Sequence, residues 1–230
     1  MKIVFLNVWN AHEREPLFAF IREQIQDTDI FCLQEAYPNT RHLFEDALPG
    51  FRLTSAYKFI VTDEDFAQAT YVREGLEQGT AEVLFEREPF RCGLGICTPV
   101  RFGEDVLQVI NFHGLSKPGA KMDDPDRLRQ SRGLIEFMAG KPGPKIIGGD
   151  LNLMPDTESV GMFAKNGYRD LIADFKIPTT RNRLVWDKYP DSKQYYSDYV
   201  FVSPEVKVKE FSVPQNEISD HLPLIVDIQI

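Results

Sequence analysis

Apolar runs of strand length alternate with amphipathic segments along most of the chain. The run KIVFLNVW at 2–9 is typical of a buried strand, because it is almost continuously apolar and carries one amide, Asn7, near its end. The segment 13–26 instead places Leu17, Ile21 and Ile25 at helical spacing, which predicts an amphipathic helix. Strands are predicted over 2–9, 29–34, 105–113, 145–150 and 198–204 and after His221, and helices over 13–26, 39–48, 128–139 and 157–165.

The region between residues 51 and 102 has the pattern of several antiparallel strands. Within it, the polar segment 72–79 contains Arg73, Glu74 and Glu77. We interpret this segment as the solvated end of a hairpin rather than as a functional loop.

Two long polar loops remain, at 114–127 and 178–197. Loops of this length in compact proteins often serve function. The second loop interleaves basic and aromatic side chains, among them Arg181 and Trp186. Such side chains can hold a phosphate ester and its organic part, or they can simply pin the loop to the protein body.

The stretch KIIGGDLNLMP at 145–155 combines an apolar strand with a polar end. Asp150 and Asn152 follow two glycines at a spacing of two, which in an extended backbone directs both side chains to one face. The glycines predict a tight turn at the strand end, where α/β folds gather catalytic groups. Taken alone, such a stretch is more often just a turn, so the rest of the sequence decides its interpretation.

Further polar side chains lie at the ends of predicted strands. Each has a structural alternative: Glu35 can be a solvated acid that opens a loop, and His113 can be a satisfied core histidine beside Asn111 on the same strand face. The whole set consists of Asn7, Glu35, His113, the Asp150/Asn152 pair, Asp198 and the adjacent Asp220 and His221.

The composition bounds the architecture and the location. With 230 residues, 43% of them hydrophobic, the chain can bury one sizeable core, so we expect a single domain over 1–230. No apolar run approaches the roughly 18 residues of a transmembrane segment. Cys32, Cys92 and Cys97 lack zinc-like spacing and are expected to be buried, reduced thiols of a cytoplasmic protein.

The charge balance bears on possible partners. The chain has 35 acidic and 26 basic residues and a formal net charge of −9. Such a balance disfavours non-specific binding to a phosphate backbone, which normally uses a basic face. It does not exclude nucleic acid, because divalent cations held by clustered acids reverse the local field.

Six short motifs connect the polar strand ends and run from residue 6 to residue 224. They are LNVWN at 6–10, LQE at 33–35, NFHG at 111–114, GGDLN at 148–152, SDYVFVSP at 197–204 and SDHLPL at 219–224. In order and spacing, the chain resembles the endonuclease/exonuclease/phosphatase superfamily of metal-dependent phosphoesterases. The resemblance implies an α/β fold of the α+β type, a four-layer sandwich of two packed mixed β-sheets flanked by helices.

The resemblance also implies a metal site. Glu35 would be a metal ligand, with Asn7 and Asp220 close to the same cation. Oxygen donors of this kind suit Mg²⁺ or Mn²⁺, which leave further positions to waters and substrate phosphate.

The acid–base roles follow from the same resemblance. Asp150 would orient and deprotonate the attacking water, while Asn152 holds that water or a phosphate oxygen. His221, held and charged by Asp198, would donate to a non-bridging phosphoryl oxygen, and His113 would donate from another side.

Two departures from the family pattern concern the substrate. His113, in NFHGLSKPG, stands where the abasic-site repair branch usually has a Tyr-containing, Pro-Asn-rich stretch, which favours branches that cleave DNA non-specifically or hydrolyse small or lipid phosphate esters. In VLFEREPF at 83–90, Glu86 occupies the place of a family Ser, so substrate contacts on that side are expected to differ.

The leading hypothesis is a cytoplasmic phosphoester hydrolase that depends on Mg²⁺ or Mn²⁺ and attacks a small-molecule, lipid or nucleic-acid phosphate ester with water. A nuclease is the alternative, and it would require a basic groove from the loops 114–129 and 178–197. A non-catalytic phosphate-binding module is disfavoured, because none of the implied catalytic residues is lost. No motif points to an oligomeric state. Candidate substrate contacts are Asn111, Lys117, Arg181 and Trp186.

Overall fold

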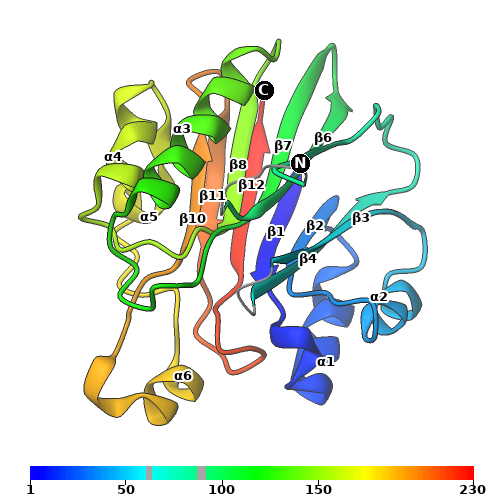
Figure 1. Ribbon diagram of the computed structural model, residues 1–230. Helices are drawn as coiled ribbons and strands as arrows, with labels where there is room; N and C mark the ends of the chain where they lie inside the picture. Colours follow the sequence, from blue (N-terminus) through cyan, green and yellow to red (C-terminus); the bar gives the residue numbers. More distant parts are fainter. Residues whose placement is uncertain (61–63, 87–91) are drawn as a thin grey trace.

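Two six-stranded β-sheets pack face to face in the computed structural model, which describes residues 1–60, 64–86 and 92–230 (Figure 1). The first sheet has the spatial order β11 (Lys207–Ser212), β12 (Leu224–Gln229), β1 (Lys2–Asn7), β2 (Ile30–Gln34), β4 (Glu64–Arg73) and β3 (Phe51–Ile60). The second sheet has the order β5 (Glu82–Leu84), β6 (Leu94–Phe102), β7 (Asp105–His113), β8 (Lys145–Asp150), β10 (Asp198–Val202) and β9 (Arg169–Asp170).

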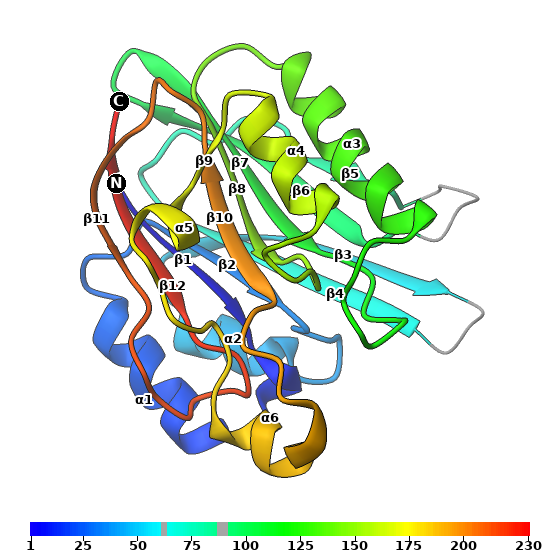
Figure 2. The same cartoon turned by 90° about the vertical axis from the view of Figure 1, so that its left-hand side faces the viewer.

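Helices cover the outer faces of both sheets. Figure 2 shows α3 (Pro125–Ala139) and α4 (Glu158–Lys165) over the second sheet, and α1 (Arg14–Gln24) and α2 (Arg41–Ala47) on the opposite side, over the first. The short helix α5 (Leu171–Asp174) packs beside β10. The predicted four-layer α/β sandwich is therefore confirmed. No helix of the described residues is long and apolar enough to cross a membrane.

Alternation along β1 builds two separate apolar layers. Ile3 and Phe5 belong to the core between the two sheets, whereas Val4 and Leu6 pack in the cluster that includes Leu17 of α1. Because successive side chains of a strand point to opposite faces, one continuous apolar run supplies both layers. All three cysteines are also buried in the core, as the sequence predicts.

The two glycines of the GGD stretch lie inside β8 and do not form the predicted turn. A Cβ atom on Gly148 would lie 2.7 Å from the Phe5 ring of the other sheet. A Cβ atom on Gly149 would lie 2.2 Å from the Phe112 carbonyl oxygen. The φ of Gly149 is +130°, a backbone conformation that residues with a side chain rarely adopt. The glycines therefore permit close packing, and the strand continues through them to Asp150.

Two sequence interpretations were wrong about connections. β4 ends at Arg73 and pairs with β2 and β3, whereas β5 pairs with β6, so the segment 72–79 leads from one sheet to the other and is no hairpin end. Residues 178–197 are also more than a loop, because they contain α6 (Arg183–Lys188) and the 3₁₀ helix η2 (Pro190–Ser192). In Figure 1, α6 lies below the ends of the strands.

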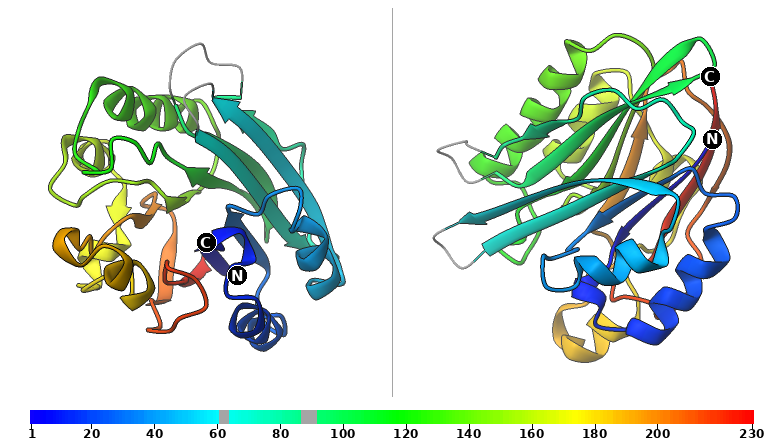
Figure 3. Two further views of the ribbon diagram at one scale, coloured as in Figure 1. Left: turned by 60° about the horizontal axis from the view of Figure 1, so that its bottom comes forward. Right: turned by 90° about the vertical axis from the view of Figure 1, so that its right-hand side faces the viewer.

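The sheet pairing brings the polar strand ends to one edge of the sandwich. β7 and β8 are parallel with His113 opposite Asp150, and antiparallel β10 places Asp198 opposite Asp150. In the other sheet, β1 and β2 are parallel with Asn7 opposite Gln34, so Glu35 follows at the same edge. In the right-hand view of Figure 3, α6, in gold, lies at the bottom, at the end of the sandwich where these polar strand ends meet.

Candidate active site

Asp150 is the central acid of the site, and its side chain is 2% exposed. Its Oδ1 accepts hydrogen bonds from the Ser197 hydroxyl at 2.5 Å and from the Asn152 backbone N–H at 3.0 Å. Its Oδ2 faces Nε2 of His221 at 3.5 Å and Nε2 of His113 at 3.6 Å. Oδ1 is thus held by Ser197 and the backbone, whereas Oδ2 faces two imidazoles and also accepts a bond from the Asn7 amide.

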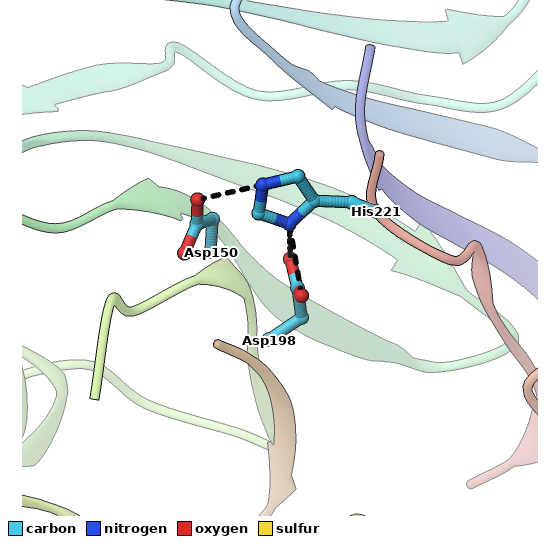
Figure 4. A group of neighbouring side chains, drawn as sticks. All are labelled: Asp150, Asp198 and His221. Atoms are coloured by element: carbon cyan, nitrogen blue, oxygen red, sulfur yellow. Dashed lines mark hydrogen bonds and ion pairs between the residues drawn. The ribbon is translucent and has the colours of Figure 1, made fainter. Parts of the chain in front are cut away.

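His221 is fixed by Asp198 (Figure 4). Nδ1 of the ring lies 2.9 and 3.0 Å from the two Asp198 oxygens, which leaves Nε2 directed toward Asp150. Both side chains are nearly buried. A carboxylate on Nδ1 fixes the orientation of the ring and stabilises its protonated form, so His221 can donate a proton from Nε2.

Asn7 connects the two sheets at the site. Its amide Nδ2 donates to Glu35 Oε1 at 2.9 Å and to Asp150 Oδ2 at 3.1 Å. Nε2 of His113 lies 4.0 Å from the same Glu35 oxygen, and the His113 ring packs edge-on against Phe66 with centroids 5.1 Å apart. The first sheet thus contributes an amide and an acid directly beside Asp150 of the second.

Asp220 is engaged by Arg181, a pairing that the sequence did not predict. The Arg181 guanidinium donates to Asp220 Oδ2 at 2.8 Å and to the Asp220 backbone carbonyl at 3.1 Å. The other Asp220 oxygen, Oδ1, lies 3.9 Å from Nε2 of His221. The charge of Arg181 is therefore partly balanced by Asp220, so less of it is available to bind a substrate.

Asn152 reaches the site through a backbone conformation other than the expected extended one. Its φ is +55°, in the left-handed region, and its Nδ2 donates to the Gly114 carbonyl at 3.1 Å. Asn residues adopt this conformation more readily than most. Asp150 and Asn152 both line the pocket, as expected, but strand alternation is not the reason.

Positive neighbours keep Asp150 ionised. Burial alone raises the pKa of the Asp150 carboxyl, but the charges of His221, Lys121 and His113 outweigh burial and lower the pKa. Burial, with the charge of Arg181, in turn lowers the pKa of Lys121 to about 8. Asp150 is therefore available as a proton acceptor at neutral pH.

Asp150 influences the pKa values of both members of the pair formed by His221 and Asp198. Burial is the largest influence on Asp198, and together with the charge of Asp150 it raises the pKa of this acid despite His221. Burial and Arg181 lower the pKa of His221, but Asp198 and Asp150 outweigh them, so that the pKa is raised. The imidazole is thus favoured in its proton-donating form.

A pocket of about 590 Å³ opens over these groups. Trp186 lines it, with its indole N–H donating to the Gln194 carbonyl at 2.9 Å. Lys117 is exposed on the neighbouring loop, outside the pocket lining. The lining consists of Trp9, Glu35, His113, Ser116, Gly119, Ala120, Lys121, Asp150, Asn152, Arg181, Val185, Trp186, Tyr189, Ser192, Gln194, Asp220 and His221.

The expectation that Asn111 contacts substrate does not fit its position. The residue is fully buried between the sheets. Its Oδ1 accepts from Gln34 at 2.7 Å, and its Nδ2 donates to the carbonyls of Leu33 and Ala69 at 3.2 Å each. Its amide is used to bond the two sheets together, and it is not part of the pocket lining.

Sequence reasoning missed two supporting residues, Lys121 and Ser197. The buried Lys121 ammonium donates to the Ser197 hydroxyl at 2.7 Å, and this hydroxyl donates to Asp150. Lys121 was visible only as one base in a polar loop, and Ser197 only as the residue before Asp198. Residues 87–90 of the divergent stretch 83–90 lie outside the described residues, so the expected change of substrate contacts there is not tested.

Two groups of side chains are candidates for a metal site. Ligand atoms of Asp150, Asp198 and His221 all lie within 4.8 Å of one another. However, both Asp198 oxygens already face Nδ1 of His221, so they are engaged within the group. Glu35 has the most exposed acidic side chain of the site, at 24%, beside the Asn7 amide. A carboxylate oxygen such as that of Glu35 fits a hard divalent cation, so the Glu35 side of the pocket is the better candidate.

The family is now defined by sequence as well as by structure. The Endonuclease/Exonuclease/phosphatase family matches residues 4–221, nearly the whole chain, and the protein belongs to this family. Its members are hydrolases that act on phosphoester bonds and depend on divalent metal ions. No curated protein matches the chain in sequence.

Solved structures with this fold cover different reactions. The mannosyl-6-phosphatase of Bacteroides thetaiotaomicron is 20% identical with a TM-score of 0.76, and the match covers 100% of each chain. The human Nocturnin catalytic domain is 17% identical with a TM-score of 0.72, over 100% of this chain and 94% of that one. D. rerio TDP2 with a single strand DNA product is 16% identical with a TM-score of 0.73, over 100% and 99%. At these identities the likeness shows the fold alone.

Proposed function

We propose that the protein is a divalent-metal-dependent phosphoester hydrolase that uses water as the nucleophile. The observation that carries the proposal is the environment of Asp150, an ionised, buried carboxylate whose Oδ2 accepts a bond from Asn7 and faces His113 and His221 in the pocket. A general base requires a carboxylate held in this way, and proton donors on either side suit the charge that builds on a phosphoryl group.

Each of the surrounding side chains has a definite part in this proposal. Asp150 Oδ2 takes the proton of the attacking water, and Asn152 holds that water or a phosphate oxygen. His221, oriented by Asp198, donates from Nε2 to a phosphoryl oxygen, and His113 donates from the other side. These donors are fixed before the substrate arrives, so little free energy is lost in reorganising them.

The metal ion is proposed to bind at Glu35, with the Asn7 and Asp220 side chains close by. A bound Mg²⁺ or Mn²⁺ would polarise the phosphoryl oxygens and neutralise developing charge. Glu35 can provide a carboxylate oxygen from the first sheet, whereas Asp198 belongs to the second. The ion pair between Asp220 and Arg181 makes Asp220 the weaker ligand, because its charge is already balanced.

The alternative of a nuclease is supported less well. Arg127 from the first loop is fully buried, where it donates to the carbonyls of Met122 at 2.8 Å and Pro118 at 2.7 Å. Arg181 and Arg183 from the second loop pair with Asp220 and Glu217. Arg127 and Arg183 thus stabilise the loops, and Arg181, although it lines the pocket, is paired with an acid. This distribution of charge favours a small or lipid phosphate ester over a nucleic acid strand.

The test is hydrolysis of a panel of phosphate esters with Mg²⁺ or Mn²⁺. The panel contains plasmid DNA, an aryl phosphodiester, phosphatidylinositol phosphate and simple phosphomonoesters, and Asp150→Asn is the control. We expect turnover of at least one small or lipid ester, lost in the control. Cleavage of DNA alone would make the protein a nuclease. If no member of the panel is hydrolysed, the proposal that the protein is a phosphoester hydrolase is contradicted.

A further inference from the structure

The pocket is much larger than the reacting phosphoryl group. Its volume of about 590 Å³ lies within the range of roughly 300–1,000 Å³ typical of pockets that enclose a drug-sized organic molecule. The side chains proposed for catalysis, among them His113, Asp150 and His221, are only a part of its lining. The remaining space is available to the organic part of an ester, and its walls determine which organic group fits.

Four of the residues that line the pocket have bulky apolar side chains, and three of these are aromatic. They are Trp9, Val185, Trp186 and Tyr189, which we call the aromatic wall. Trp9 lies in the 3₁₀ helix η1 (Trp9–Ala11), directly after β1, whereas the other three come from α6 and its C-terminal end. Two segments far apart in the sequence thus build one surface.

The ammonium group of Lys188 connects the two parts of the aromatic wall. Its Nζ lies 5.9 Å from the centroid of the Trp9 ring and 5.5 Å from that of the Tyr189 ring. Both distances are within the range of a cation–π contact. The rings of Trp9 and Tyr189 therefore neighbour the same ammonium group and line the same pocket.

The rings of the aromatic wall are held by neighbours. The Trp186 ring packs against Tyr195 with centroids 5.1 Å apart, and its N–H is bonded to the Gln194 carbonyl. The Trp9 ring packs on His12 at 4.1 Å. Since these side chains are already ordered, a ring that stacks on them costs little additional conformational entropy.

The backbone that carries Trp9 adopts an unusual conformation. Trp9, Asn10 and Ala11 have φ values of +46°, +50° and +54°, a left-handed turn that residues other than glycine rarely form. The Trp9 N–H donates to Asn7 Oδ1 at 3.0 Å, and the Asn10 N–H donates to the Glu35 carbonyl at 3.2 Å. The turn is therefore tied to the two residues at the proposed metal site, which fixes the backbone of Trp9 relative to Asn7 and Glu35.

We propose that the aromatic wall binds a flat aromatic ring, an aryl group or a nucleobase, in the organic part of the substrate. The inference rests on the proposed function, because the ring reaches the wall as part of an ester whose phosphoryl group lies against Asp150. A flat ring stacks on indole and phenol faces, and this contact is tolerant of the kind of ring. A sugar alone is disfavoured, because its many hydroxyls would meet few polar partners on this wall.

The test compares ligands that differ only in the ring. Adenosine 5′-monophosphate and ribose 5-phosphate share the same phosphate ester, and phenyl phosphate and cyclohexyl phosphate share the same size. Binding to the Asp150→Asn variant is measured by calorimetry with Mg²⁺ present, so that turnover does not interfere. We expect the aromatic member of at least one pair to bind about tenfold more tightly, the effect of one stacked ring. The pair that responds tells a nucleobase from an aryl group.

Variants of the wall identify where the ring binds. Trp9→Ala and Tyr189→Ala, each combined with Asp150→Asn, should remove most of the preference for the ring, whereas Trp9→Phe should keep part of it. Tyr57→Ala is the matched control, because Tyr57 is a similarly exposed tyrosine on β3, outside the pocket. Tyr189 is 51% exposed, so its truncation tests the wall even if Trp9→Ala unfolds the left-handed turn.

The outcomes separate this inference from the proposed function. Equal affinity within both pairs, or tighter binding of glucose 6-phosphate than of either aromatic ester, would overturn the aromatic wall as a ring site even in an active enzyme. Ring-dependent binding by a protein that hydrolyses no ester would contradict the proposed function and leave the ring site standing.

Discussion

The two oxygens of Asp150 have different surroundings, and this difference assigns their parts. Oδ1 accepts bonds from Ser197 and from the backbone of Asn152, both within 3.0 Å. Oδ2 is the oxygen that faces His113 and His221. The proton of a water molecule in the pocket is therefore expected to pass to Oδ2, while Oδ1 keeps the carboxylate from rotating.

Replacing Asp150 by asparagine should remove the base and keep the shape. We expect Asp150→Asn to lower kcat by about 10²- to 10⁴-fold, the usual contribution of a general base, with little change in the thermal unfolding midpoint. Asp187→Asn is the control, because Asp187 is an exposed acid on α6. An Asp150→Asn protein that is well folded and nearly as active as the wild type would exclude Asp150 as the base.

Ser197 and Lys121 should act as one unit on Asp150. Ser197→Ala and Lys121→Met are each expected to lower kcat by roughly tenfold, the scale of one lost hydrogen bond at the base. Because Lys121 reaches Asp150 through the Ser197 hydroxyl, the double variant should lose less than the product of the two single losses.

Steady-state kinetics of the four proteins in this cycle provide the measurement. Lys193→Met serves as the control, since Lys193 is an exposed base of the loop 178–197. Fully multiplicative losses would show that Lys121 acts on the reaction by a separate route.

The sequence could predict those site residues whose position follows from a strand end. His113 and Asp150 are examples, because each closes an apolar run and parallel pairing aligns them. Lys121 and Ser197 could not be found in this way, since only the folding of a long loop over the site brings them together. Asn111 was misassigned because the pattern gives the face of a strand and does not tell a pocket from a sheet-to-sheet contact.

At the scale of elements, the sequence pattern predicted where single strands lie, but it did not predict which strands belong to the same sheet. The strands at 105–113 and 145–150 have the predicted bounds. The antiparallel strands predicted within 51–102 do form, but β3 and β4 belong to one sheet and β5 and β6 to the other. Apolar alternation reports which side of a strand is buried, and it carries no information on which sheet the strand joins.

Gly148 tests the close packing of the two sheets. We expect Gly148→Ala to lower the free energy of unfolding by about 1–3 kcal/mol, because its methyl group would meet the Phe5 ring at 2.7 Å and overpack the core. Gly161→Ala is the matched control in α4, where a Cβ atom meets nothing within 4 Å and alanine favours the helix. Equal stability of both variants in urea unfolding would contradict the tight contact.

Asp170 should make the stability of the protein depend on pH. It caps α5 with bonds to the N–H groups of Ile172 and Ala173, but burial raises its pKa to about 6 from the ordinary 3.8. The folded state therefore binds a proton that the unfolded state releases between these values, and the resulting stability is present below pH 4 and lost as the pH rises through 6.

Asp170→Asn removes this titration and keeps an acceptor for the cap. We expect the variant to gain about 1–2 kcal/mol relative to the wild type between pH 4 and pH 7. Urea unfolding of both proteins across this range measures the difference in their free energies of unfolding. The contributions of the other titrating groups are the same in both proteins and cancel in this difference. A difference that does not vary with pH would mean that the carboxyl of Asp170 titrates normally.

At the scale of the whole molecule, the site exists only where the two sheets meet. Asn7 and Glu35 come from the first sheet, whereas His113, Asp150 and Asp198 come from the second. The Asn7 amide bridges them through bonds to Glu35 and Asp150. Activity therefore requires the sheets to be packed together, and it should be lost together with the tertiary fold in denaturant.

Removal of metal should abolish activity without unfolding the protein. We expect dialysis against EDTA to eliminate hydrolysis, and Mg²⁺ or Mn²⁺ to restore it, since the acids of the site then lack the cation that balances substrate charge. Glu35→Gln should raise the metal concentration needed for half-maximal activity by about tenfold or more. Full activity in the presence of EDTA would exclude a divalent ion from the reaction.

Three of the four residues of the aromatic wall, Val185, Trp186 and Tyr189, lie on a different part of the chain from the proton-transfer groups. Asp150, Asp198 and His113 lie on strands of the rigid frame, whereas α6 and η2 form one excursion that leaves β9 and α5 and returns at β10. Its base is fastened outside the reacting centre, by Asn182 to the carbonyls of Asn216 and Ser219. Substitutions within residues 183–192 should therefore change which organic group the pocket accepts, while the strands keep the proton-transfer groups in place.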